Sequence, residues 1–90
     1  MTHADEEALR RLLPLLRQLR EIKGLREMKP GIFYLKGNAF LHFHDDAGKP
    51  IADLKKAGGG GFDRYPVDTA PAQRKLLDDA KRRVGRVDED

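Results

Sequence analysis

Two histidines separated by one residue are the side chains in this chain best suited to chemistry. His42 and His44 precede Asp45 and Asp46. Alternate residues of a strand point to the same face, so both imidazoles could reach one metal ion. A divalent metal such as zinc would need further ligands, which Asp46 or His3 would have to supply. Two ligands at a strand end do not make a site, so we predict no metal and no cofactor.

Nucleophiles are scarce. The chain has no cysteine and no serine, and its aliphatic hydroxyls belong to Thr2 and Thr69. Thr69 is better explained as a helix cap. We therefore name no catalytic residue and favour a binding protein over an enzyme. The alternative is a metal-dependent or acid/base enzyme centred on His42 and His44.

Four consecutive glycines, Gly58 to Gly61, follow Lys55 and Lys56. A phosphate-binding loop needs Gly-x-x-x-x-Gly-Lys-Ser/Thr before a helix, and a dinucleotide site needs Gly-x-Gly-x-x-Gly in a βαβ unit. The sequence matches neither pattern. The glycines predict a flexible connector, which could form a mobile flap over the histidines.

The charge distribution favours a mixed surface. The net charge is +3, from 18 Lys and Arg against 15 Asp and Glu. In the last predicted helix, opposite charges recur four residues apart, which is typical of a solvated helix. These pairs are Arg74–Asp78, Lys75–Asp79, Asp78–Arg82 and Asp79–Arg83. Nucleic acid is therefore a secondary alternative as partner.

Hydrophobic periodicity predicts helices at both ends of the chain. Leucines spaced three and four apart indicate a helix over residues 5–23, either kinked at Pro14 or beginning near it. A second helix is expected over residues 70–84, stopped by Gly85 and followed by a frayed tail at 86–90. Between them, strands are expected at 31–35, 39–44, 51–55 and 62–65.

These elements predict one α+β domain over residues 1–90. We expect an antiparallel three- to four-stranded meander flanked by an N-terminal and a C-terminal helix, with both helices on one sheet face. No apolar run reaches the ~20 residues that a membrane span needs. An acidic N-terminus and the absence of cysteine favour the cytoplasm and no membrane partner.

The first hairpin assigns side chains to the two faces. With Gly37 and Asn38 as the loop, cross-strand partners share a face. One face then holds Ile32, Tyr34, Ala39, Leu41 and Phe43, and should take the helices. The other holds Phe33, Leu35, Phe40, His42 and His44.

This second, half-apolar face is the candidate binding surface. Fully burying one Phe or Leu is worth about 1.5–3 kcal/mol, so something should cover it. Phe62 and Tyr65 of the chain itself could do so. We expect an interaction module that self-associates as a homodimer through the sheet. The alternative is a single-stranded nucleic acid stacked on Phe33 and Phe40.

The segment from Gly31 to His44, with Phe62 to Thr69 and the closing helix, resembles small uncharacterised bacterial proteins. The resemblance spans about residues 30–84. It implies a bacterial, intracellular protein and no particular activity. It assigns no functional residue.

Overall fold

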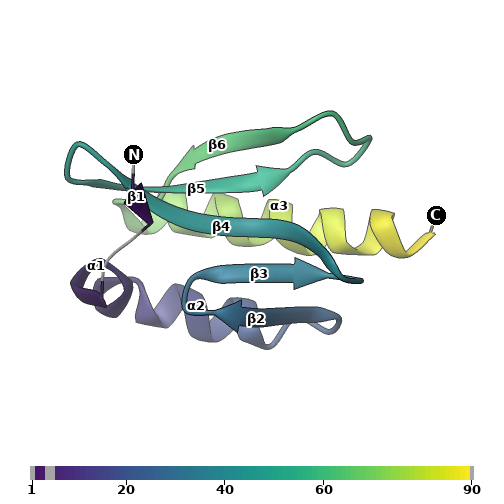
Figure 1. Ribbon diagram of the computed structural model, residues 1–90, viewed down its shortest axis with the longest axis horizontal. Helices are drawn as coiled ribbons and strands as arrows, with labels where there is room; N and C mark the ends of the chain where they lie inside the picture. The colour runs from purple at the N-terminus through teal and green to yellow at the C-terminus, as the bar shows by residue number, and fades with distance from the viewer. Residues whose placement is uncertain (1, 4–5, 90) are drawn as a thin grey trace.

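Five antiparallel strands follow one another across a single sheet in a computed structural model that describes residues 2–3 and 6–89. The order β2-β3-β4-β5-β6 is that of a meander, and a short β1 pairs with β4 outside this path (Figure 1). The strands are β1 Thr2–His3, β2 Leu25–Lys29, β3 Ile32–Leu35, β4 Asn38–Asp46, β5 Lys49–Lys55 and β6 Phe62–Pro66. The predicted fold class is confirmed, with β1 and β2 as strands that were not predicted.

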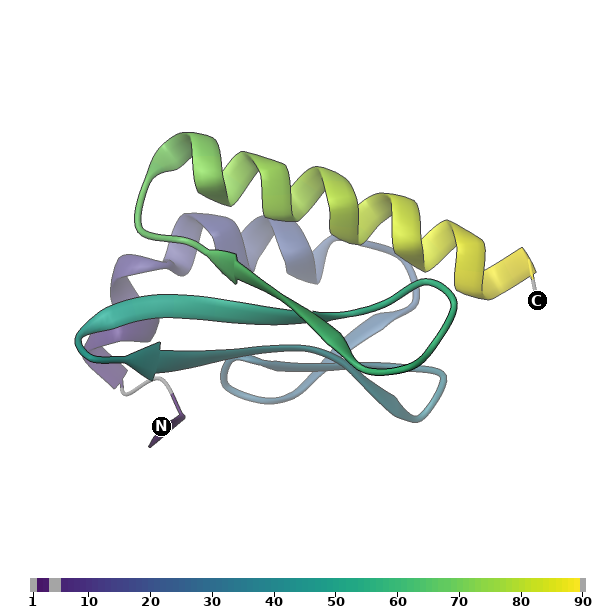
Figure 2. The same cartoon turned by 90° about the horizontal axis from the view of Figure 1, so that it is seen from above.

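The helices cover one face of the sheet and leave the other without a helix (Figure 2). They are α1 Glu6–Arg11, α2 Leu13–Arg20 and α3 Ala70–Glu89. The chain leaves helical geometry at Leu12 and resumes it with Pro14 in the first turn of α2. There a proline costs no hydrogen bond, so the expectation that a helix begins near Pro14 is confirmed.

The last helix begins as predicted but runs further. The Thr69 Oγ1 accepts a hydrogen bond from the Ala72 amide at 3.2 Å, which confirms Thr69 as a cap. The prediction that Gly85 ends the helix is wrong, because α3 continues to Glu89. Glycine within a helix costs only about 1 kcal/mol. None of the described helices is long and apolar enough to cross a membrane.

The hydrophobic core lies between the helices and the sheet. Its members come from every element except β1 and α1, with Leu9 of α1 packed against it. The largest fully buried side chains are Phe33, Phe40, Phe43, Leu16, Leu19, Leu41, Leu54, Leu76 and Val67.

The β3–β4 hairpin contains a bulge that the sequence did not predict. Its turn residues are Lys36 and Gly37, both with positive φ (53° and 84°), as a type I′ turn requires. Tyr34 pairs with Ala39 but Phe33 pairs with Leu41, so Phe40 is an extra residue on β4. One extra residue in a strand turns each side chain beyond it to the opposite face of the sheet.

The bulge overturns the predicted division of side chains between the faces. Phe33, Leu35 and Phe40 are 0%, 3% and 1% exposed and belong to the core. They therefore do not share a surface with the histidines, and that part of the predicted binding surface is wrong. Beyond the bulge Leu41 and Phe43 join the core, whereas His42 and His44 lie on the opposite face.

An ion pair fastens β2 to the helix layer. The Arg20 guanidinium donates two hydrogen bonds to the Glu27 carboxylate, at 2.5 and 3.2 Å, and the Gly31 amide donates a third at 2.9 Å. Burial acts to raise the pKa of Glu27, but these hydrogen bonds outweigh it and lower that pKa. Sequence periodicity misses β2 because only Leu25 of its residues is buried.

A polar network joins β6 to α3. The Tyr65 hydroxyl donates to Asp79 at 2.6 Å and accepts from Arg83 at 3.1 Å. Arg83 also donates to the backbone oxygen of Lys55 at 3.0 Å. Arg83 thus bonds to residues of the sheet, whereas the sequence predicted an ion pair with Asp79. Burial, and then the hydrogen bond to Asp79, raise the pKa of Tyr65 to about 12.

The face assignment can be tested by two neighbouring substitutions. We expect Phe33→Ala to lower the free energy of unfolding by about 3–5 kcal/mol or to prevent folding, because it empties a core site. Tyr34→Ala on the opposite face should cost about 1 kcal/mol. Urea denaturation measures both. The reverse order of the two costs would contradict the bulged register.

The Tyr65 network predicts a loss of stability in alkali. Because its pKa is about 12 in the folded state and about 10 in the unfolded chain, Tyr65 contributes stability below pH 10. That contribution, about 3 kcal/mol, is lost as the pH rises towards 12. Tyr65→Phe should remove this part of the pH dependence. Tyr34→Phe, the matched control among the chain's two tyrosines, should leave it unchanged.

Candidate functional site

The sheet face opposite the helices is here called the open face, and it carries His42 and His44. It is defined by cross-strand partners, which share a face. Its members are Arg26, Met28, Lys29, Ile32, Tyr34, Ala39, His42, His44, Asp46, Lys49, Ile51, Asp53, Lys55, Phe62, Arg64 and Pro66.

The open face is basic. Among these described residues, five Lys or Arg stand against two Asp, a net charge of +3. The whole chain also has a net charge of +3. The rest of the chain is therefore neutral overall, and the basic excess lies on one side of the sheet.

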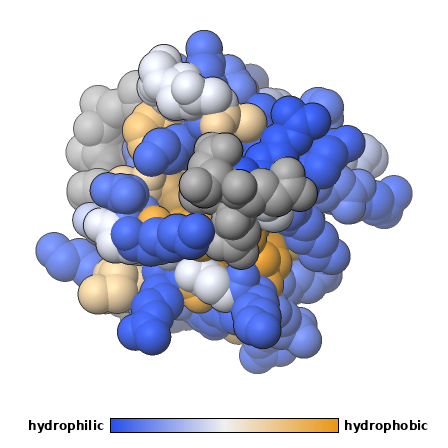
Figure 3. Space-filling view, turned by 90° about the vertical axis from the view of Figure 1, so that its right-hand side faces the viewer, coloured by the Kyte–Doolittle hydropathy of each residue, from blue (hydrophilic) through white to orange (hydrophobic). Residues whose placement is uncertain are grey.

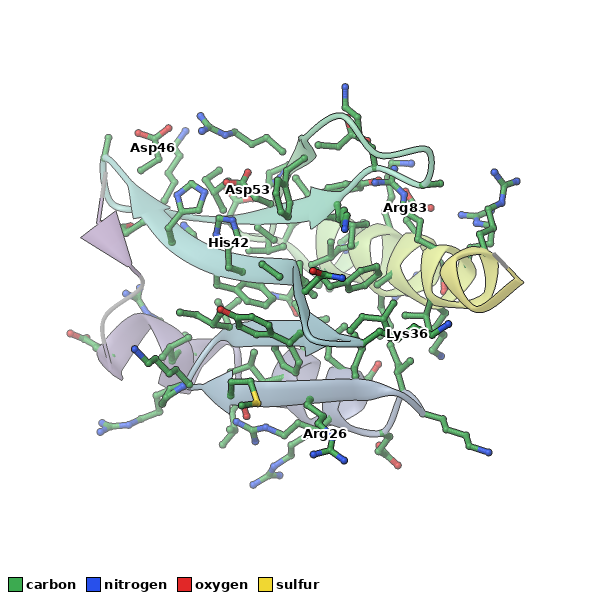
Figure 4. The ribbon with its side chains drawn as sticks, turned by 45° about the vertical axis from the view of Figure 1, so that its right-hand side comes forward. Arg26, Lys36, His42, Asp46, Asp53 and Arg83 are labelled. Atoms are coloured by element: carbon green, nitrogen blue, oxygen red, sulfur yellow. The ribbon has the colours of Figure 1, made fainter. Side chains whose placement is uncertain are left out.

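Three side chains, those of His42, His44 and Asp53, converge on this face from β4 and β5, and Figure 4 shows His42 and Asp53 among them. The register places Asp53 directly opposite His42, with His44 two residues along the same strand. The His44 Nε2 lies 2.8 Å from Asp53 Oδ2, and the His42 Nε2 lies 3.9 Å from the same oxygen. One ligand atom from each of the three residues lies within 4.8 Å of the other two.

His44 is unusual within this group because it is buried. Only 5% of the residue is exposed, and its Nδ1 has no hydrogen-bond partner among the described residues. A carboxylate only accepts hydrogen bonds, so the tautomer protonated at Nε2 donates to Asp53. Among the described residues, the imidazole is therefore hydrogen-bonded through Nε2 only.

Arg64 of β6 holds the other side of the carboxylate. Its Nε lies 3.7 Å from Asp53 Oδ1, and its Nη1 lies 3.7 Å from Asp46 Oδ2. Asp46, a candidate metal ligand on sequence grounds, thus pairs with Arg64 rather than joining the histidines. The side chain of His3, the other candidate, lies outside the described part of the structure.

The glycine loop places one aromatic ring on the open face. Phe62, directly after the loop, packs edge-on against His42 with ring centroids 5.4 Å apart. Tyr65, the other residue expected to cover this face, lies in the core on the helix side. The expected cover is therefore partial, and Phe62 itself remains 41% exposed.

A shallow hollow of about 540 Å³ lies at the β2–β3 end of the open face. It is lined by Arg26, Met28 and Tyr34, with Lys36 and glycines of the two turns at its rim. The end of the molecule that bears these turns shows hydrophobic residues only as small areas among hydrophilic ones (Figure 3). The hollow thus combines one aromatic ring with two cations.

Of the five predicted surface residues, only His42 and His44 lie on the open face. Three other residues of the open face were not predicted: Asp53, which lies beside both histidines, Arg64, which lies beside Asp53, and Tyr34, which lines the hollow. A signal for Asp53 was available, because a carboxylate in the short apolar segment Ile51–Leu54 needs a partner on its own face. Nothing in the sequence paired it with the histidines, since that requires the register of β4 on β5.

Comparison with known proteins adds no assignment. No family model matches the chain, and it matches neither a curated protein nor a solved structure. Any function must therefore be argued from the geometry of this chain.

The His44–Asp53 contact predicts a measurable stability effect. Asp53→Ala removes the partner of a buried imidazole, so we expect the free energy of unfolding to fall by about 1–3 kcal/mol. Asp46→Ala, which breaks only an exposed pair with Arg64, should cost about 0.5 kcal/mol or less. Chemical denaturation of both variants provides the comparison. Equal costs would show that Asp53 contributes no more than a surface charge.

Proposed function

We propose that this chain is a binding module for single-stranded nucleic acid and that the open face is its binding surface. The observation that carries the proposal is the charge distribution, with a net +3 on one sheet face and a neutral remainder. Basic surfaces attract phosphates, and single strands also offer bases that stack on aromatic rings.

The aromatic side chains of the open face support this choice of partner. Tyr34 lines the hollow together with Arg26 and Lys36, a combination suited to a stacked base with its phosphates on the cations. Phe62 of β6 and His42 of β4 offer a second stacking position on the same face. They take the role that the sequence analysis gave to Phe33 and Phe40, which are buried.

A second copy of the chain is a weaker candidate as the occupant. Self-association was expected because Phe33, Leu35 and Phe40 seemed exposed, and their burial removes that reason. Two basic faces would also repel each other. Pairing through the edges is disfavoured by a bulge in β2 and by Pro66 in β6. We keep the cytoplasm as the expected compartment.

Fluorescence anisotropy with labelled oligo-uridine and oligo-thymidine tests the proposal. If about three phosphates are contacted, the logarithm of the association constant should fall with a slope of roughly −2 against the logarithm of salt concentration. Tyr34→Ala should weaken binding about 5- to 100-fold, the value of one stacked base. Tyr34→Phe retains the ring and should bind nearly as well as the unmodified protein.

A matched pair of charge variants locates the binding surface. Arg26→Gln on the open face should weaken binding and make the salt slope shallower by about 0.7. Arg74→Gln, the same change at an exposed position of α3, should leave the affinity and the salt slope unchanged. Equal effects of the two variants, or no binding at low salt, would contradict the proposal. A concentration-dependent dimer in light scattering that Tyr34→Ala abolishes would instead favour self-association.

A further inference from the structure

We propose that His42, His44 and Asp53 form a binding site for one divalent transition-metal ion. The inference does not depend on nucleic-acid binding, although His42 also belongs to the second stacking position, because it rests on the geometry of three side chains and is tested with metal alone. It revises the prediction of no metal, which assumed that the two histidines had no third partner.

The three groups converge on one point rather than merely lying close together. Both imidazoles direct Nε2 towards the same carboxylate oxygen, Asp53 Oδ2, at 2.8 and 3.9 Å. In a tetrahedral site with bonds of about 2.0–2.1 Å, ligand atoms are roughly 3.3 Å apart. The two separations from Asp53 lie on either side of that value, and all three atoms lie within 4.8 Å of one another, so side-chain rotations would bring them to coordinating distance.

The donor set selects the class of metal. Two imidazole nitrogens and one carboxylate oxygen suit Zn²⁺, Co²⁺, Ni²⁺ or Fe²⁺, whereas Mg²⁺ and Ca²⁺ prefer oxygen ligands throughout. Three protein ligands leave at least one position for water or for a bound molecule. The site is therefore of the open kind rather than the closed, purely structural kind.

The burial of His44 holds one of the three ligands in place. Its side chain is 7% exposed, and its Nε2 donates to Asp53 at 2.8 Å. That contact directs Nε2 towards the proposed position of the ion. A metal bond at Nε2 would replace this hydrogen bond and place the ring proton on Nδ1.

Arg64 is compatible with a bound cation. It approaches Oδ1 of Asp53, the oxygen that the histidines do not share, and its charge is divided between Asp53 and Asp46. A group that holds the remaining oxygen orients the carboxylate, as second partners of metal ligands commonly do.

Isothermal titration calorimetry with ZnCl₂, NiCl₂ and CoCl₂ on the full chain tests the site. We expect one ion per chain and no comparable binding of MgCl₂. The absorption spectrum of the Co²⁺ complex should show nitrogen and oxygen ligation. His42→Ala, a change at a partly exposed residue, should weaken Zn²⁺ binding by at least about tenfold.

Asp53→Asn should weaken Zn²⁺ binding similarly, and circular dichroism verifies that both variants fold. Asp78→Asn, the same change at an exposed position of α3, is the matched control. This variant should bind Zn²⁺ as the unmodified protein does. Failure of all three transition metals to bind would overturn the proposal. Binding that survives both His42→Ala and Asp53→Asn would also overturn it, because the metal would then lie elsewhere.

Discussion

The single extra residue at Phe40 decides what each face of the sheet carries. Without it, the turn at Lys36 and Gly37 would leave Phe33, Leu35, Phe40, His42 and His44 on one face. With it, the aromatic and leucine side chains enter the core and the histidines turn away from the helices. The bulge thus resolves a conflict within β4, whose residues would otherwise bury two imidazoles beneath the helices or leave phenylalanines in water.

The energetic preference for this arrangement is large. Phe33, Phe40, Leu41 and Phe43 are all at most 1% exposed, and each buried ring or leucine contributes about 1.5–3 kcal/mol. A bulge sacrifices local ladder hydrogen bonding, at about 0.5–1.5 kcal/mol for each bond. Packing therefore outweighs regular pairing, and the strand is re-aimed at the place where the sheet presents His42 and His44.

The polar contacts on the two sides of the sheet differ in what they join. On the helix side, Glu27 with Arg20 and Tyr65 with Asp79 join strands to helices. On the open side, Asp53 joins His44 within the sheet. The charged groups of Arg20, Glu27 and Asp79 thus join the two layers, whereas the open face has the basic excess. Binding is proposed for that face because the basic excess of the chain lies there.

The sequence alone determined the helix layer and the types and order of the elements other than β1 and β2. Leucine spacing, Pro14 and Thr69 act within a few residues, so local patterns suffice to predict α2, the start of α3 and the strands β3 to β6. The mostly polar β2 escaped notice because its stability comes from Glu27 and from partners elsewhere in the chain. The two histidines were recognised as a pair, since their spacing is local too. Only the tertiary structure decided which face they occupy and that Asp53 joins them. A bulge depends on the packing of the whole core, and a contact between β4 and β5 depends on a register that no local pattern specifies.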